Sequence, residues 1–138
     1  MMKLSKLLLL AALFASVSAH QGYSDENTVT YCGTLLSGSA LTDVVTTVQF
    51  KGEADLAGTY KFLEDGKPVN GTLVTKDAMK DHQAVLLWTD KYGEGSLAVT
   101  FSEDFDSFHG KWGTGSNEPT YSWQGKKCES TAEPGVAS

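Results

Sequence analysis

Residues 43 to 63 read DVVTTVQFKGEADLAGTYKFL, and this segment carries the clearest strand pattern of the chain. Across 44–50 the side chains fall into two alternating sets, Val-Thr-Val-Phe and Val-Thr-Gln, and a two-residue period is typical of a β-strand. The turn-forming residues 52–55 separate this strand from a second one at 56–63. Because parallel strands need crossovers of about a dozen residues or more, so short a connection predicts an antiparallel pair.

The rest of the chain repeats this pattern. No window between Thr28 and Cys128 has the 3.6-residue apolar stripe of an amphipathic helix, and only residues 77–81 would suit a helical turn. Gly, Asp, Asn and Pro interrupt the alternating segments at short intervals. The sequence therefore predicts eight strands, near residues 28–37, 43–51, 56–63, 68–76, 84–89, 95–102, 107–113 and 119–127.

A weak internal repeat indicates how these strands are arranged. The segments 56–60 and 108–112 share an order of apolar residue, gap, glycine, gap and aromatic residue. Alternation places each glycine on the face that carries the large side chains, where a glycine permits sharp bending of the strand. Closure of the sheet would also remove its exposed edges. We therefore expect an all-β fold, an eight-stranded antiparallel up-and-down β-barrel.

The two cysteines fit such a closed sheet. Cys32 lies in the first predicted strand and Cys128 at the end of the last, and these strands are neighbours in a closed meander. We therefore expect a disulfide between the first and last strands. A catalytic thiol is the competing interpretation, but no Cys/His spacing in the sequence suggests an activated nucleophile.

The glycine–aromatic elements between Gly33 and Lys127 resemble those of small secreted calycin-type barrels, and of the avidin family in particular. Leu56-Ala57-Gly58-Thr59-Tyr60 is similar to that family's third-strand element. The resemblance implies an aromatic-lined barrel interior, which Trp88 and Trp112 would suit. The last strands lack the family's Thr/Arg-rich ending, so contacts to biotin are not implied. Lipocalins match less well, because a C-terminal helix is not evident.

The first nineteen residues have the features of a secretory signal peptide. Lys3 and Lys6 precede the apolar run 7–15, and the small residues of 17–19 follow as a cleavage site. A membrane anchor is the alternative, but spanning a bilayer takes about 20 apolar residues. We expect a secreted protein, extracellular or periplasmic. It would comprise a signal peptide at 1–19, a flexible N-terminus at 20–27, a barrel domain at 28–128 and a disordered tail at 129–138.

Composition excludes several partners. The 138 residues include 17 Asp and Glu against 11 Lys and Arg, and all eleven basic residues are lysine. Removal of Lys3 and Lys6 with the signal peptide would leave nine lysines, and 9 − 17 gives a net charge of −8. Such a balance repels nucleic acid and anionic membranes, and the absence of arginine removes the usual reader of phosphates and bases. We therefore expect neither nucleic acid nor a membrane as partner.

The aromatic residues are the main functional clue. The interior of an eight-stranded barrel is either filled by side chains or holds one small ligand. If it is open, an aromatic lining would select a small apolar or aromatic ligand, and we expect a non-enzymatic binding protein with no cofactor and no metal. The candidate ligand-binding residues are Tyr60, Trp88, Phe108, Trp112 and Trp123. A filled core would need the same side chains, so the sequence leaves both interiors open.

Catalysis has little support in the sequence. Glu64, Asp90 and other carboxylates gather at the predicted hairpin ends, where acidic residues are ordinary turn formers exposed to solvent. Cleavage after residue 19 would make His20 the N-terminal residue, a potential copper ligand, but a second histidine would have to come from His82 or His109. The sequence contains no nucleophile-elbow, phosphate-loop or zinc motif.

Two features concern the outside of the protein. The alternative function is a protein-binding module, such as an inhibitor that projects residues 20–24 toward an extracellular enzyme.

Asn70-Gly71-Thr72 is an acceptor sequence for N-glycosylation if the protein comes from a eukaryote.

Overall fold

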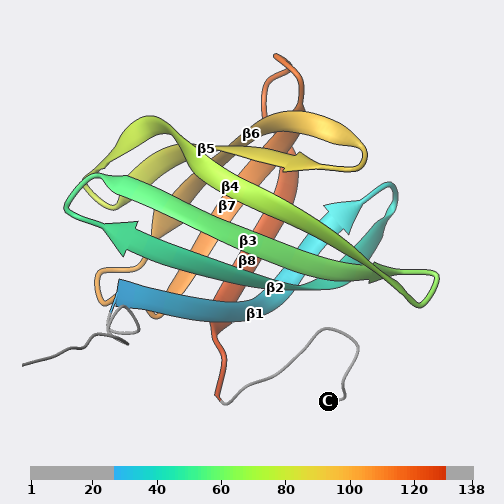
Figure 1. The fold of residues 1–138 in the computed structure, drawn as a ribbon, viewed down its shortest axis with the longest axis horizontal. Helices are drawn as coiled ribbons and strands as arrows, with labels where there is room; N and C mark the ends of the chain where they lie inside the picture. The colour runs from blue at the N-terminus through green and yellow to red at the C-terminus, as the bar shows by residue number, and fades with distance from the viewer. Residues whose placement is uncertain (1–26, 130–138) are drawn as a thin grey trace, which may run out of the picture.

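The computed structural model describes residues 27–129 and shows a single sheet closed into a barrel (Figure 1). Each strand pairs antiparallel with the next, and the last strand returns to pair with the first. The eight strands are β1 (Thr28–Ser37), β2 (Ala40–Lys51), β3 (Asp55–Glu64), β4 (Lys67–Lys80), β5 (Gln83–Asp90), β6 (Gly93–Phe101), β7 (Ser107–Thr114) and β8 (Tyr121–Lys127). The predicted eight-stranded up-and-down barrel is therefore confirmed.

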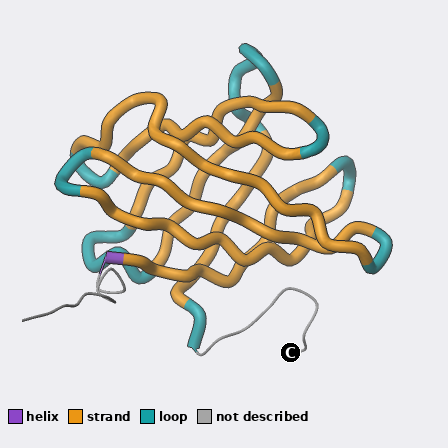
Figure 2. Tube along the Cα trace, in the orientation of Figure 1, coloured by secondary structure: helices purple, strands orange, loops and turns teal. Residues whose placement is uncertain are grey.

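The turns fall into two groups, one at each end of the barrel. The β1–β2, β3–β4, β5–β6 and β7–β8 connections share one end, which we call the open end. The β2–β3, β4–β5 and β6–β7 connections share the other, which we call the closed end. Figure 1 shows the first three open-end turns on the right, and Figure 2 shows that strand makes up nearly all of the wall between the two groups.

Inward-facing side chains form one continuous core. In β2, Val44, Thr46 and Val48 are buried while their neighbours face outward, as the alternation predicts. Two aromatic rings lie beside glycines of the next strand, since Tyr60 pairs with Gly71 and Phe108 with Gly125. A Cβ atom on Gly71 would stand 2.1 Å from Cζ of Tyr60. The glycines therefore make room on the inner face for these two rings.

The predicted disulfide is present. Cys32 of β1 is bonded to Cys128, which directly follows β8, and their Cα atoms are 5.1 Å apart. The backbone N–H of Cys128 also donates to the carbonyl of Thr30 at 2.9 Å. The covalent link therefore fastens the last strand to the first beside the closed end.

Residues 77–81, the one segment whose sequence would suit a helical turn, form no helix. Residues 77–80 continue β4, whose pairing with β5 shifts register on both sides of Asp77. A bulge of this kind bends the strand and leaves an extra residue unpaired. Beyond the bulge, Met79 lies at the closed end. Its N–H donates to the carbonyl of Ala54 at 2.9 Å, and its side chain packs against the core.

Several expectations concern segments outside residues 27–129. The signal peptide at 1–19, residues 20–26 of the N-terminal segment with His20, and residues 130–138 of the tail all lie outside the described residues. Within the described part of the chain, no helix is long and apolar enough to cross a membrane.

Candidate functional site

The closed end of the barrel is filled by aromatic side chains. Phe105, in the β6–β7 turn, lies with its ring centroid 5.1 Å from that of Phe50 and 5.5 Å from that of Phe101. Tyr31 meets Phe108 edge to face at 5.0 Å, and its hydroxyl donates to the carbonyl of Phe105 at 2.8 Å. Burial of the Tyr31 ring raises the pKa of its hydroxyl, so this donor keeps its proton.

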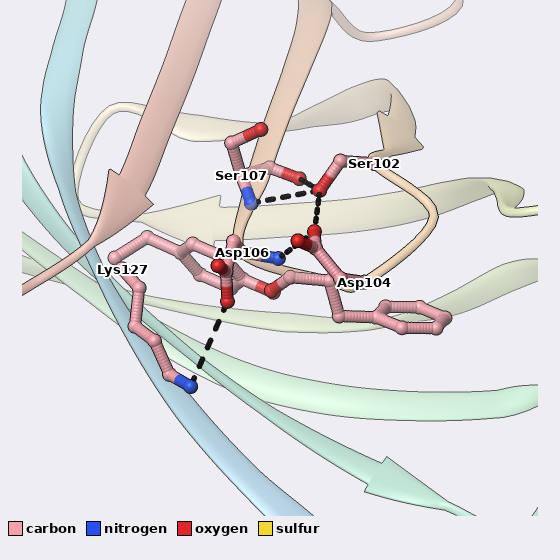
Figure 3. A network of polar contacts seen from close by, with 7 residues as sticks. Ser102, Asp104, Asp106, Ser107 and Lys127 are labelled. Carbon is pink, nitrogen blue, oxygen red and sulfur yellow. Dashed lines mark hydrogen bonds and ion pairs between the residues drawn. The ribbon is translucent and has the colours of Figure 1, made fainter.

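The β6–β7 turn is held by a polar network, drawn in Figure 3. Asp104 Oδ1 accepts from the Ser102 hydroxyl at 2.9 Å and from the Asp106 N–H at 3.0 Å. The N–H of Ser107 donates to Ser102 Oγ at 3.0 Å. The bond from the Asp106 N–H, and then the bond from the Ser102 hydroxyl, lower the pKa of Asp104 below its ordinary value of 3.8. The network holds the turn that carries Phe105 over the closed end.

Beneath these rings the interior is packed. A void of about 10 Å³ lies here, bounded by residues such as Val48, Leu73 and Phe108. Such a volume is no larger than about one water molecule requires. Trp123 closes this region from the other side, with its indole N–H donating to the buried Thr46 hydroxyl at 3.1 Å. This void is too small for an organic ligand.

At the open end the barrel contains a cavity of about 210 Å³. The residues around it come from five strands and one turn and combine aromatic rings with a polar rim. They are Leu35, Ser37, Tyr60, Phe62, Glu64, Trp88, Asp90, Tyr92, Trp112, Thr114 and Trp123. The barrel is therefore filled in one half and open in the other.

The lining follows from the alternation within each strand. Side chains two residues apart in a strand share a face. In three of the strands that line the cavity, the last inward-facing residue therefore stands at the rim, and a larger apolar residue lies below it. In β3, Glu64 stands at the rim and Phe62 lies one step deeper on the same inner face. Asp90 and Trp88 are related in the same way in β5, and Thr114 and Trp112 in β7. The cavity is therefore apolar in its depth and polar at its mouth.

The tryptophans turn their polar atoms away from the cavity. The indole N–H of Trp88 donates to the carbonyl of Gly113 at 2.9 Å, and that of Trp112 to the carbonyl of Leu36 at 3.0 Å. These two rings meet edge to face, with centroids 5.6 Å apart. Since the N–H of Trp123 is also bonded, all three indoles offer the cavity only carbon surface and π-electrons.

The rim carboxylates are held by tyrosines. Asp90 Oδ2 accepts from the Tyr60 hydroxyl at 2.7 Å, and Asp90 Oδ1 accepts from the N–H of Tyr92 at 2.8 Å. The Tyr92 hydroxyl donates to Glu64 in turn, which raises the pKa of Tyr92 to about 12. Burial, and then the bond to Asp90, raise the pKa of Tyr60. Both hydroxyls stay protonated and committed to carboxylates.

Four of the five candidate ligand-binding residues surround one cavity. Tyr60, Trp88, Trp112 and Trp123 all line it, whereas Phe108 lies among the closed-end aromatics. Contact of any of them with a ligand stays a prediction. The sequence predicts that Glu64 and Asp90 lie at solvated hairpin ends, and the structure places both at strand ends and also on the rim of the cavity. The signal that could have shown this was their two-residue spacing from Phe62 and Trp88.

A second hollow lies on the outer face of the barrel. It has a volume of about 610 Å³ and follows the cross-strand row Asp77, Val85, Ala98 and Lys111. No aromatic ring other than the imidazole of His109 borders it, and the charges along it are mixed. Small-molecule sites are enclosed and mostly apolar, so the smaller interior cavity is the better candidate.

Neither a metal site nor a similar protein of known function helps to identify a role for this cavity. Among residues 27–129, no three His, Cys, Asp or Glu side chains are grouped so as to hold a metal ion. Comparisons of the chain with family models, with curated proteins and with solved structures return no match. The geometry of the cavity is therefore the basis for a proposal about function.

Proposed function

We propose that this protein is a secreted, non-enzymatic binding protein that holds one small apolar or aromatic ligand in the open end of its barrel. The observation that carries the proposal is the cavity between Trp88, Trp112 and Trp123, whose N–H groups are all bonded to the protein. A side chain with its polar atom already satisfied gains by covering apolar surface of a ligand, because that surface leaves water.

The size of the cavity limits the ligand. An apolar cavity of about 150 Å³ accepts benzene, and drug-sized pockets begin at about 300 Å³. At about 210 Å³ the cavity lies between these values. A single ring with a short polar side arm would fill it, with the ring among the tryptophans and the arm toward the rim.

Secretion and the family resemblance belong to the same proposal. The Cys32–Cys128 bond suits an oxidising extracellular or periplasmic location. A ligand in the mouth of a small closed barrel is also how a calycin-type, avidin-like protein would work. The alternative of a protein-binding module rests on residues 20–24, which lie outside the described residues.

Tryptophan fluorescence tests the proposal, because three indoles border the cavity. Titration with 2-phenylethanol should change the emission saturably in the wild-type protein. The Trp112→Phe variant should retain binding with a smaller emission change, and Trp88→Ala should bind much more weakly. A matched control is Phe108→Leu, which alters an aromatic residue of the closed end. Absence of saturable binding in the wild type, or equal loss in Phe108→Leu and Trp88→Ala, would contradict the proposal.

A further inference from the structure

We infer that the ligand is a small organic cation, an aromatic or apolar body carrying an ammonium group that reaches the rim of the cavity. This inference rests on the proposed function and assigns the ligand's chemical class. It is carried by the mismatch between the hydrogen-bond donors and acceptors that line the cavity.

The donors of the lining are already used. The three indole N–H groups and the hydroxyls of Tyr60 and Tyr92 all donate to other atoms of the protein. Among the eleven lining residues, only the hydroxyls of Ser37 and Thr114 are further side-chain donors, and none of the eleven is Lys, Arg or His. An anionic ligand would therefore enter a site with two carboxylates and no cationic partner among its lining residues.

Acceptors, in contrast, are in excess. Asp90 accepts two hydrogen bonds, both from uncharged donors, and a carboxylate offers about four lone-pair positions. Glu64 stands beside it on the rim and accepts from Tyr92. A ligand ammonium supplies three donors and a positive charge, so it can use the remaining acceptor positions of both side chains.

The aromatic walls favour the same charge. The faces of indole and phenol rings carry negative electrostatic potential and attract a cation within about 6 Å of the ring centre. Trp88, Trp112 and Trp123 present such rings because their N–H groups point away. Since the cavity is partly withdrawn from water, this attraction is stronger than on an exposed surface.

The chain's own lysine shows how a cation sits at this rim. The ammonium of Lys91 lies 3.7 Å from Glu64 and 5.1 Å above the ring of Tyr92. Its side chain is mostly exposed, so the pair contributes little to stability. A ligand ammonium entering the mouth would meet the same two kinds of partner, and Lys91 would compete with it for Glu64.

Calorimetric titration with three matched probes tests the inference. 2-Phenylethylammonium, 2-phenylethanol and phenylacetate share a ring and a short arm but are positive, neutral and negative. The ammonium should bind at least about tenfold more tightly than the alcohol, and the carboxylate should bind most weakly. If the alcohol binds as tightly as the ammonium, or phenylacetate binds best, the inference fails and the proposed function stands. If none of the three binds at millimolar concentration, both fail.

Three variants locate the effect. Asp90→Asn should weaken binding of the ammonium by about tenfold and leave binding of the alcohol nearly unchanged. The amide oxygen still accepts from Tyr60, and only the exposed bond from the Tyr92 N–H is lost. Lys91→Gln should strengthen ammonium binding, because it removes the competing cation. Asp65→Asn is the matched control, since it loses the same charge in the β3–β4 turn but does not line the cavity. An equal loss in Asp65→Asn and Asp90→Asn would show only a general charge effect and overturn the assignment.

Discussion

The two ends of this barrel use aromatic residues in opposite ways. At the closed end, Phe105 and its neighbours pack ring against ring and leave a void of about 10 Å³ beneath them. At the open end, Trp88 and Trp112 line a cavity of about 210 Å³ instead of filling it. The closed end also has the disulfide and the hydrogen-bonded β6–β7 turn.

If the proposed function holds, one closed sheet separates stability from ligand binding along its axis. Rings that contact each other on all sides contribute full packing energy, whereas rings beside a cavity lack partners on one side. The open end therefore gives up part of the packing energy that the closed end has, and its aromatic rings face a cavity instead. Changes at the closed end should lower stability and spare binding, and changes at the open end should mainly affect binding.

The largest expected effect comes from deleting one phenylalanine at each end. Phe108→Ala should lower the free energy of unfolding by about 3–5 kcal/mol, because Phe108 is buried against the rings of Tyr31 and Phe101. Phe62→Ala should cost less, because Phe62 borders the cavity, and should weaken ligand binding. Denaturant unfolding and calorimetric titration measure the two quantities. Weaker ligand binding in Phe108→Ala than in Phe62→Ala would remove the distinction between the ends.

Removal of the disulfide should have the next largest effect. In Cys32→Ser combined with Cys128→Ser, the loss of a link across 96 residues should lower stability by about 2–4 kcal/mol. Thermal unfolding should show a lower Tm, and ligand affinity in the still-folded protein should be unchanged. Reductant should lower the Tm of the wild type alone. Two free thiols in the oxidised wild-type protein would contradict the fold at the β1–β8 seam.

A smaller loss of stability is expected when Gly71, which lies against the cavity-lining ring of Tyr60, is replaced. Gly71→Ala forces the Tyr60 ring aside, so stability should fall by about 1–3 kcal/mol and the bond from Tyr60 to Asp90 should weaken. In a Tyr60→Leu background the same substitution should cost less, since the clashing ring is gone. Denaturant unfolding of the four proteins gives the coupling. If the losses of stability in Gly71→Ala and Tyr60→Leu simply add in the double variant, the position of the Tyr60 ring does not depend on Gly71.

The smallest expected effect is the pH dependence of the closed-end turn. The folded pKa of Asp104 lies below its ordinary value of 3.8, so its contribution to stability is present above pH 3.8. That contribution is lost as the pH falls from 3.8 through the lower folded value. Asp104→Asn should therefore be slightly less stable than wild type at neutral pH, and the gap should close in acid. Acid titration of the Tm measures it; a gap that widens in acid would contradict the sign.

Much of the fold could be predicted because it depends on local alternation. The period of two identified all eight strands, and closure of the meander then placed Cys32 beside Cys128. The bulge in β4 was missed because residues 77–81 contain no regular alternation, and it is tertiary pairing with Gln83 and Val85 that keeps them extended.

The cavity was harder to predict, because alternation gives the face of a side chain but not its height along the barrel. Phe108 and Trp112 share one face of β7, yet four residues of strand separate them by about 13 Å. One therefore lies in the packed half and the other beside the cavity. The roles of Glu64 and Asp90 depend on the same height, which the register of the whole closed sheet determines.

The central claim is that only the open half of the barrel takes a ligand, and one diffraction measurement tests it most directly. Crystals soaked with 2-(4-bromophenyl)ethanol locate the ring through the anomalous signal of bromine. We expect one strong bromine peak inside the barrel, among Trp88, Trp112 and Trp123. A peak confined to the outer hollow beside His109, or no peak in the cavity at saturating concentration, would contradict it.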